Sequence, residues 1–203
     1  MAGNIELIIN AIVGLSVFAV IAAVAVDFAF FQEKRKERVI KKSPVATFTM
    51  FCFFFLFYAI EKNSWGVWEL SNYGARAVMI AAGLALMVTG AYVNIAGRFK
   101  LGGNWSDHIK IYLGHKMVSD GVYALVRHPL YASLIWMFYG SALVYSNWLA
   151  FLANTFIFVP AMYYRAKQEE RLLIREFFAY KDYQRKVGMF LPKLKIKFNK
   201  TKK

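Results

Sequence analysis

The chain has 203 residues, of which 59% are hydrophobic and 18% aromatic, and its formal net charge is +14 at pH 7. This apolar share is well above that of an ordinary soluble domain, which excludes most water-soluble fold classes. The single cysteine, Cys52, excludes a disulfide framework and a thiolate metal site.

Four apolar blocks follow one another along the chain. The first three cover residues 5–31, 44–60 and 75–97, and each suits a helix across a bilayer core, which needs about 20 apolar residues. The fourth, residues 130–164, is interrupted at Ser146-Asn147-Trp148 and divides into two halves of roughly 16 residues. We therefore expect an all-α integral membrane protein with about five transmembrane helices, two of them forming a short helical hairpin.

The basic residues predict the same arrangement. Of the 26 Lys and Arg residues, 24 lie in the segments 33–42, 98–129 and 165–203. Five spans place these segments on one face of the membrane, and the positive-inside rule then predicts an outside N-terminus and a cytoplasmic C-terminus. The positive charge is thus explained by this bias and by anionic lipid headgroups, and not by nucleic-acid binding.

Three regions follow from this pattern. Residues 1–97 form an N-terminal three-helix membrane region. Residues 98–192 hold a cytoplasmic loop, the helical hairpin and a C-terminal helix, and they carry most of the polar motifs. Residues 193–203 form a basic tail that alternates lysine with apolar residues, which predicts a segment that binds lipid headgroups.

A few polar residues interrupt the apolar blocks, where they are costly unless they find partners. Asp27 lies near the inner end of the first block, close to the charged segment 33–42, so we expect it to form an ion pair or to reach the membrane interface. Asn94 and Asn154 are expected to form hydrogen bonds between helices.

The stretch at residues 114–131, GHKMVSDGVYALVRHPLY, is polar and lies between two apolar blocks. Pro129 lies at the expected start of the fourth helix, where proline is tolerated because its missing N–H would be unpaired anyway. The residue before it is then extended, which exposes backbone groups to a ligand. Beyond the hairpin, Arg165 and Glu169 are four residues apart and share one face of a predicted helix.

Each of these residues also has a simpler interpretation. Arg165 and Glu169 could form only an exposed ion pair worth about 0.3–0.5 kcal/mol. His128 could hydrogen-bond a helix end or a lipid phosphate. His108 and His115 do not predict a metal site, because no carboxylate or cysteine lies at ligand spacing.

The order of the polar motifs makes the functional interpretation stronger. They are His115-Lys116-Met117-Val118, Gly121-Val122-Tyr123, Arg127-His128-Pro129-Leu130-Tyr131, and, after the hairpin, Arg165-x-x-x-Glu169-Glu170-x-x-Leu173. In this order they resemble the isoprenylcysteine carboxyl methyltransferase family, which belongs to a wider group that includes membrane phospholipid methyltransferases. The resemblance covers roughly residues 102–192, including a closing pattern from Tyr180 to Pro192. The short five-span form is similar to prokaryotic members, which implies a prokaryotic cell membrane.

The resemblance implies methyl transfer from S-adenosyl-L-methionine to a lipidic or prenylated acceptor at the membrane surface. Arg165 matches the residue assigned to the acceptor carboxylate, and Arg165, His128 and Arg127 are the candidate catalytic residues. The implied cofactor contacts are Lys110, His115, Lys116, Met117, Val118, Tyr123, His128, Pro129, Leu130, Tyr131 and Glu169. The family usually has a Phe-Gly pair near Phe178, and this chain lacks that glycine.

Carboxylate methylation is the first expectation, since a carboxylate is already ionised and needs a clamping cation instead of a base. N-methylation of a phospholipid or small amine is an alternative, in which His128 would be the base. A non-catalytic membrane protein on the same scaffold and a reductase of related architecture are two others. The oligomeric state is not encoded in any of these motifs.

Overall fold

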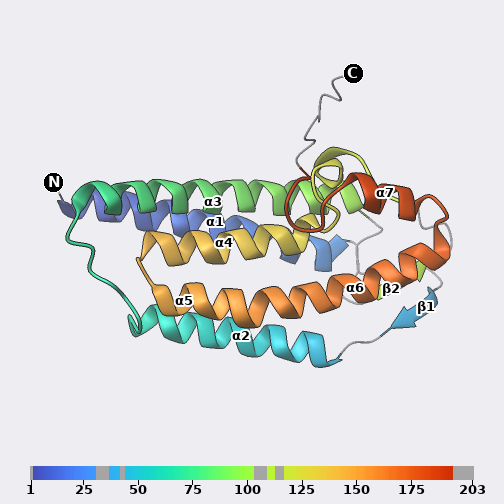
Figure 1. The fold of residues 1–203 in the computed structure, drawn as a ribbon, viewed down its shortest axis with the longest axis horizontal. Coiled ribbons are helices and arrows are strands. Elements are labelled where there is room, and N and C mark those ends of the chain that lie inside the picture. Colours follow the sequence, from blue (N-terminus) through green and yellow to red (C-terminus); the bar gives the residue numbers. More distant parts are fainter. Residues whose placement is uncertain (1, 31–36, 42–43, 103–108, 113–116, 194–203) are drawn as a thin grey trace, which may run out of the picture.

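The structure is a computed structural model that describes residues 2–30, 37–41, 44–102, 109–112 and 117–193. Long helices dominate it and lie side by side along one direction, as Figure 1 shows. The expected helical architecture is therefore confirmed.

The three N-terminal helices are α1 (Ala2–Phe30), α2 (Pro44–Lys62) and α3 (Tyr73–Leu101). Within the described residues, two helical stretches, Gly3–Asp27 and Tyr73–Leu101, are long and apolar enough to cross a membrane. The α3 helix begins where the Asn72 side chain accepts a hydrogen bond from the Ala75 backbone N–H at 3.0 Å, which satisfies one otherwise unpaired donor.

The second half of the chain is also helical. Its elements are the 3₁₀ helix η2 (Gly121–Ala124), α4 (Pro129–Val144), α5 (Trp148–Ala153), the π-helical turn η3 (Asn154–Phe158), α6 (Val159–Glu176) and α7 (Tyr180–Lys186). The predicted hairpin is confirmed, and Asn147 caps the start of its second arm by accepting from the Ala150 N–H at 2.9 Å. That arm continues without a break through η3 and α6, so the helix extends well past Tyr164, where the apolar block ends.

One feature departs from the expected all-α fold. Strand β1 (Glu37–Lys41) pairs with strand β2 (Ile109–Tyr112) in an antiparallel ladder, with Val39 opposite Ile111 and Ile40 opposite Lys110. Each strand pairs with one about 70 residues away in the sequence, and local periodicity does not reveal such a pairing. The ladder joins the segment after α1 to the segment after α3 at the same end of the helices.

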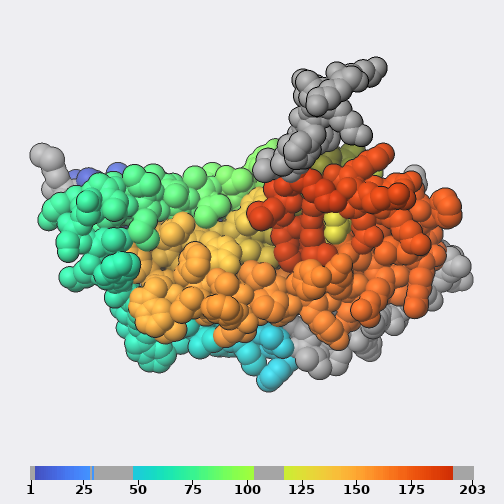
Figure 2. All heavy atoms as spheres, in the orientation of Figure 1, coloured from blue at the N-terminus to red at the C-terminus, as the bar shows by residue number. Residues whose placement is uncertain are grey.

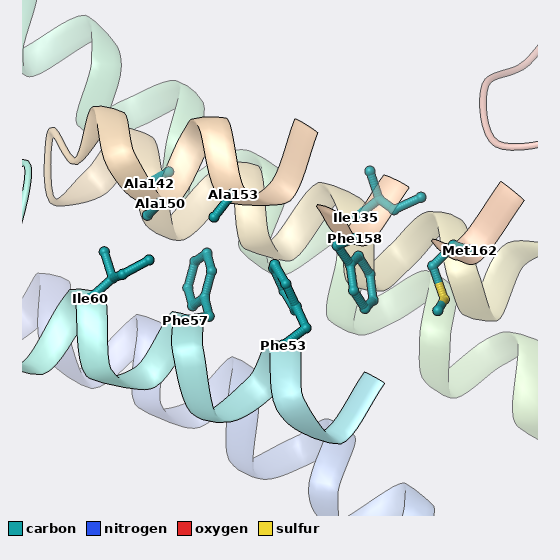
Figure 3. Close-up of a cluster of buried hydrophobic side chains, with 9 residues drawn as sticks. All are labelled: Phe53, Phe57, Ile60, Ile135, Ala142, Ala150, Ala153, Phe158 and Met162. Atoms are coloured by element: carbon teal, nitrogen blue, oxygen red, sulfur yellow. The ribbon is translucent and has the colours of Figure 1, made fainter. Parts of the chain in front are cut away.

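Side chains from both halves of the chain build the main core cluster. Phe53 and Phe57 of α2 pack against the hairpin, with Phe53 stacked on Phe158 at 4.7 Å between ring centroids. Figure 3 shows these rings between the helices. The cluster comprises Phe53, Phe57, Ile60, Ile135, Ala142, Ala150, Ala153, Phe158 and Met162. Because it joins α2 to both hairpin arms, it fixes the frame on which the polar residues of α4 and α6 are held.

The outward faces of the first helices carry large apolar side chains. Leu7 and Leu15 on α1 are about two-thirds exposed, and Phe48 and Phe55 on α2 are exposed to a similar degree or more. A water-soluble protein rarely exposes such a continuous apolar surface. These faces support the expected association with a membrane.

Candidate functional site

Arg165 and Glu169 lie on one face of α6, as predicted, but they do not form a simple exposed ion pair. The Tyr131 side chain of α4 lies between them: Arg165 Nε donates to the Tyr131 hydroxyl at 2.9 Å, and that hydroxyl donates to Glu169 Oε1. The guanidinium carbon of Arg165 is also 5.7 Å from the centroid of the Tyr131 ring. Arg165 is buried, so the connection is protected from solvent screening.

His128 lies between two carboxylates. Its Nδ1 is 3.3 Å from Glu169 Oε2, and its Nε2 is 3.3 Å from Glu170 Oε1. The ring is buried, nearly parallel to the ring of Tyr131, with 5.7 Å between the centroids. It takes this position because His128 is the residue that caps α4, directly before Pro129, and its backbone N–H donates to the Met189 carbonyl at 3.2 Å.

The two carboxylates decide the charge of His128. Burial alone would lower the pKa of the imidazole, but the hydrogen bonds to Glu169 and Glu170 outweigh it, so the pKa is raised above its usual 6.5. A positively charged imidazole can donate from both nitrogens at once, which matches the carboxylate on each side of the ring. His128 is therefore suited to hold negative groups in place.

Glu170 is the most enclosed acidic residue of the site. Its Oε1 accepts from Arg127 Nε at 2.7 Å, and its Oε2 accepts from Gln184 Nε2 at 2.8 Å. Burial acts to raise the pKa of Glu170, but the hydrogen bonds from His128 and Arg127 prevail and lower it to about 2. Glu170 is thus a fixed negative charge among buried partners.

Tyr123 enters the site from η2. The turn before it uses Gly121 at a φ of 61°, a conformation that glycine adopts without strain. The Tyr183 hydroxyl of α7 donates to the Tyr123 carbonyl at 2.6 Å and so fixes η2 against the C-terminal part of the chain. Burial raises the pKa of the Tyr123 phenol, and the negative charge of Glu169 raises it further, which keeps the hydroxyl protonated.

The structure brings six of the predicted site residues into one region. They are Tyr123, Arg127, His128, Tyr131, Arg165 and Glu169. Pro129 is buried at the start of α4, and Leu130 follows with its carbonyl accepting from Ser133 Oγ at 2.8 Å. These two residues set where α4 begins.

The remaining predicted contacts lie in the segment before η2. Met117 and Val118 are partly buried in the stretch that leads to η2. Lys110 lies in β2, opposite Ile40. His115 and Lys116 lie outside the described residues.

Several important residues were not predicted to belong to the site. Gln184 and the backbone of residues 187–189 contact Arg127 and His128, and the only sequence signal for them is the closing pattern from Tyr180 to Pro192. Glu170 was visible only as the second glutamate of the α6 motif. Its role depends on contacts that spacing along α6 does not reveal.

A second polar network lies beside the site. Arg98 of α3 donates to Asp27 of α1, and its Nε donates to Asn94 Oδ1 at 2.8 Å. Asn94 in turn donates to Ser133 Oγ of α4 at 2.7 Å, as expected for an asparagine between helices. Asp27 is therefore paired, with Arg98.

The arrangement offers groups that suit a cationic ligand and groups that suit an anionic ligand. Glu169 is one-quarter exposed and lies near the aromatic rings of Tyr123 and Tyr131, a combination that suits a ligand with an organic cation. Arg165, on the other side of the Tyr131 hydroxyl, supplies a permanent cation whose planar fork suits a carboxylate. One hydroxyl group thus connects a site for a cation with a site for an anion.

Comparison with known proteins agrees with the motifs. Residues 82–175 match the model of the isoprenylcysteine carboxyl methyltransferase (ICMT) family, from the middle of α3 almost to the end of α6. The match begins before the expected segment 102–192 and ends before its closing pattern.

Individual relatives carry related names. The chain is 31% identical over 121 residues to a protein-S-isoprenylcysteine O-methyltransferase of Saccharomyces cerevisiae, covering 58% of this chain and 51% of the yeast protein. It is 30% identical over 134 residues to methanethiol S-methyltransferase 2 of Bradyrhizobium diazoefficiens, covering 63% of this chain and 50% of that protein. The chain thus spans about half the length of these relatives.

The matched segment contains the Arg127–Tyr131 motif and the Arg165, Glu169 and Glu170 residues whose contacts are described above. The resemblance drawn from the motifs is therefore confirmed over residues 82–175, which match the model of the isoprenylcysteine carboxyl methyltransferase family.

Proposed function

We propose that this chain is an integral membrane methyltransferase that uses S-adenosyl-L-methionine and methylates a lipidic or apolar acceptor, with a carboxylate as the first choice of acceptor group. The observation that carries the proposal is the buried connection from Arg165 through the Tyr131 hydroxyl to Glu169. It sets an anion-binding group and a cation-binding group side by side, as transfer of a methyl group from a cationic donor to an anionic acceptor requires.

The residues present fit the cofactor. When bound, S-adenosyl-L-methionine supplies an electrophilic methyl group on a positively charged sulfur. Glu169 would bind the ammonium of its methionine part, because this carboxylate is partly exposed and is held by Tyr131 and His128. Tyr123 and Tyr131 would pack against the cofactor, where an aromatic face attracts a cation by about 0.5–2 kcal/mol.

Arg165 would hold the carboxylate of the acceptor. An acceptor carboxylate is already ionised at neutral pH, so Arg165 has to orient it and no base has to deprotonate it. Holding the two reactants in line contributes about 7–11 kcal/mol to catalysis in favourable cases. Burial of Arg165 keeps water from competing for the carboxylate.

The protonation of His128 weighs against an amine acceptor. An ammonium must lose a proton before it is methylated, and His128 was the candidate base for that step. Held between Glu169 and Glu170, its imidazole has a pKa raised above the usual value, which favours the charged form and makes it a poorer base. A second candidate function is S-methylation of a small thiol, and the observation that favours it is the likeness to the methanethiol S-methyltransferase.

The membrane placement belongs to the same proposal. Helices α1, α2 and α3 and the hairpin arms would provide five spans, with the N-terminus outside and the C-terminus in the cytoplasm. The site would then lie at the cytoplasmic surface, where the cofactor enters from water and the acceptor enters from the lipid. A prokaryotic cell membrane is the location that we propose.

Binding of the cofactor is tested by isothermal titration calorimetry of the detergent-purified protein with S-adenosylhomocysteine. We expect saturable binding at micromolar concentration, weakened about tenfold or more in Glu169→Gln, since a hydrogen bond to a charged group contributes about 1.5–3 kcal/mol. Asp182→Asn is the matched control, because it also neutralises a carboxylate, here an exposed one paired with Arg185. A folded wild-type protein that does not bind the ligand would overturn the proposal, and it would favour a non-catalytic protein or a reductase.

The acceptor is tested by transfer of a labelled methyl group to a prenylcysteine-type acid, a phospholipid amine and a small thiol. We expect the acid to be methylated fastest. We also expect Arg165→Ala to raise the KM for the acid, while the affinity for S-adenosylhomocysteine changes much less. Preference for the thiol would replace the carboxylate with the second candidate. Preference for the amine would contradict the charge state assigned to His128.

A further inference from the structure

The two adjacent glutamates of α6 have different surroundings. The Glu169 side chain is 25% exposed, whereas that of Glu170 is 2% exposed. Glu169 contacts Tyr131 and His128, which leaves part of its carboxylate accessible to a ligand. Glu170 contacts Arg127, His128 and Gln184, and Lys167 Nζ lies 3.7 Å from its Oε2. The first glutamate is therefore suited to binding, and the second to holding the protein together.

The contacts of Glu170 reach the C-terminal part of the chain. Gln184 of α7 donates to Glu170, and Arg127 donates from its guanidinium to the backbone carbonyls of residues 184 and 187. The backbone N–H groups of Arg127 and His128 donate to the carbonyls of Gly188 and Met189 at 2.8 and 3.2 Å. We call residues 184–189 the C-terminal clasp. Figure 2 shows α7 and the described residues after it, in red, lying against α6, in orange.

We propose that Glu170 is a positioning residue: by joining the C-terminal clasp, Arg127 and His128, it holds the His128 ring where that ring keeps Glu169 directed toward the cofactor. This inference rests on the proposed function for the role of Glu169. It goes further in separating the two glutamates of one motif into a ligand-binding residue and a residue that acts through His128.

The charges around His128 explain how Glu170 would act. Glu169 and Glu170 face the ring from α6, Tyr131 stacks on it from α4, Phe190 contacts its edge from beyond the clasp, and Arg127 precedes it in sequence. Among the residues that the structure describes, Glu169 and Glu170 are the groups that favour the charged form of the ring. With a neutral residue at position 170, burial would favour the neutral imidazole, and Glu169 would lose its cationic partner.

The test compares wild type, Glu170→Gln and the control Asp182→Asn. Histidine labelled with ¹⁵N reports the titration of each ring by NMR, and the chain has only 3 histidines, so the His128 signals are assigned from their loss in His128→Asn. We expect the His128 midpoint to lie above 6.5 in wild type and in the control and to fall by about one unit or more in Glu170→Gln. Affinity for S-adenosylhomocysteine should fall at pH 7 by up to about tenfold, because a one-unit shift in pKa changes the ratio of charged to neutral imidazole by a factor of ten.

A residue that only stabilised the fold would change the unfolding midpoint and leave the His128 titration unchanged. An unchanged titration together with an unchanged dissociation constant in folded Glu170→Gln would overturn the inference. If Glu170→Gln does not fold, Gln184→Leu decides the question, because it removes a single hydrogen bond to Glu170 and leaves Arg127 and His128 in place.

For Gln184→Leu we expect weaker binding of S-adenosylhomocysteine, and full affinity would count against the clasp. The histidine titration needs no cofactor. If wild-type protein failed to bind S-adenosylhomocysteine, the proposed function would fail, while the link between Glu170 and His128 would still be decided by NMR.

Discussion

Glycines at the contact between α3 and α4 offer a direct test of the packing that supports the site. At Gly83 an added Cβ would lie 2.6 Å from the Gly140 carbonyl oxygen and 2.9 Å from the Val144 backbone nitrogen. At Gly140 it would lie 2.7 Å from the Gly83 carbonyl oxygen. The two backbones touch through these glycines, as small residues allow between membrane helices. Alanine at either position must therefore push the helices apart.

The size of the effect follows from the distances. Ordinary contact begins near 3.4 Å, so Gly83→Ala requires a shift of about 0.8 Å, and two of the three nearest atoms in the way belong to the rigid backbone. A gap of 0.5–1 Å removes a quarter to a half of the dispersion energy of the atoms concerned. We expect a loss of about 1–3 kcal/mol in unfolding free energy. Affinity for S-adenosylhomocysteine should also fall, because Pro129 and Tyr131 begin the same helix α4.

The assay is reversible unfolding in mixed detergent micelles, followed by circular dichroism. Gly14→Ala on α1 is the control, since nothing lies within 4 Å of its added Cβ, and it should be neutral or slightly stabilising because alanine favours a helix. Equal stability of Gly83→Ala, Gly140→Ala and Gly14→Ala would refute the close backbone contact.

Four further predictions concern the polar groups. Tyr183→Phe should cost about 0.5–1.5 kcal/mol of stability and weaken cofactor binding, because the hydroxyl donates to the backbone of η2; thermal unfolding and titration calorimetry measure both. Asp27→Asn should destabilise the docking of α1, because it leaves the Arg98 charge without its acidic partner, and protease sensitivity of α1 should rise. Because the pKa of Glu170 is lowered in the folded state, this residue stabilises the fold fully above pH 4.5, and its contribution is lost as the pH falls through about 2. The unfolding free energy of Glu170→Gln should therefore depend less steeply on pH in the acid range than that of wild type. For His128, whose pKa is raised in the folded state, the dependence on pH runs the other way. Its contribution to stability is fully present below pH 6.5 and is lost as the pH rises through the raised pKa. The unfolding free energy of His128→Asn should therefore fall less than that of wild type as the pH rises.

Much of the helical architecture could be predicted from the chain alone. Apolar blocks of about 20 residues need internal hydrogen bonding in lipid, so they predict helices directly. The turn at Ser146-Asn147-Trp148 was visible because polar residues interrupt an apolar run. The β1–β2 ladder could not be predicted from the sequence, because its two strands are short and are separated in the sequence by α2 and α3.

The composition of the site was predicted better than its connections. The motifs identified Arg165, Glu169, His128 and Tyr131, and helical spacing set Arg165 and Glu169 on one face. That spacing suggested a direct ion pair as the simpler interpretation. The Tyr131 hydroxyl between them could not be inferred, because it arrives from the other arm of the hairpin.

By itself, the sequence determined the membrane class, the helix positions, the basic segments and the residue types of a methyltransferase motif, since these depend on local composition and on order along the chain. Only the tertiary structure decided that Glu169 stays partly exposed, that Glu170 is enclosed by Arg127 and Gln184, and that His128 is held between the two. The physical reason is that adjacent residues on a helix point about 100° apart, so Glu169 and Glu170 meet different neighbours. Those neighbours come from α4 and α7, and their approach depends on the packing of the whole molecule.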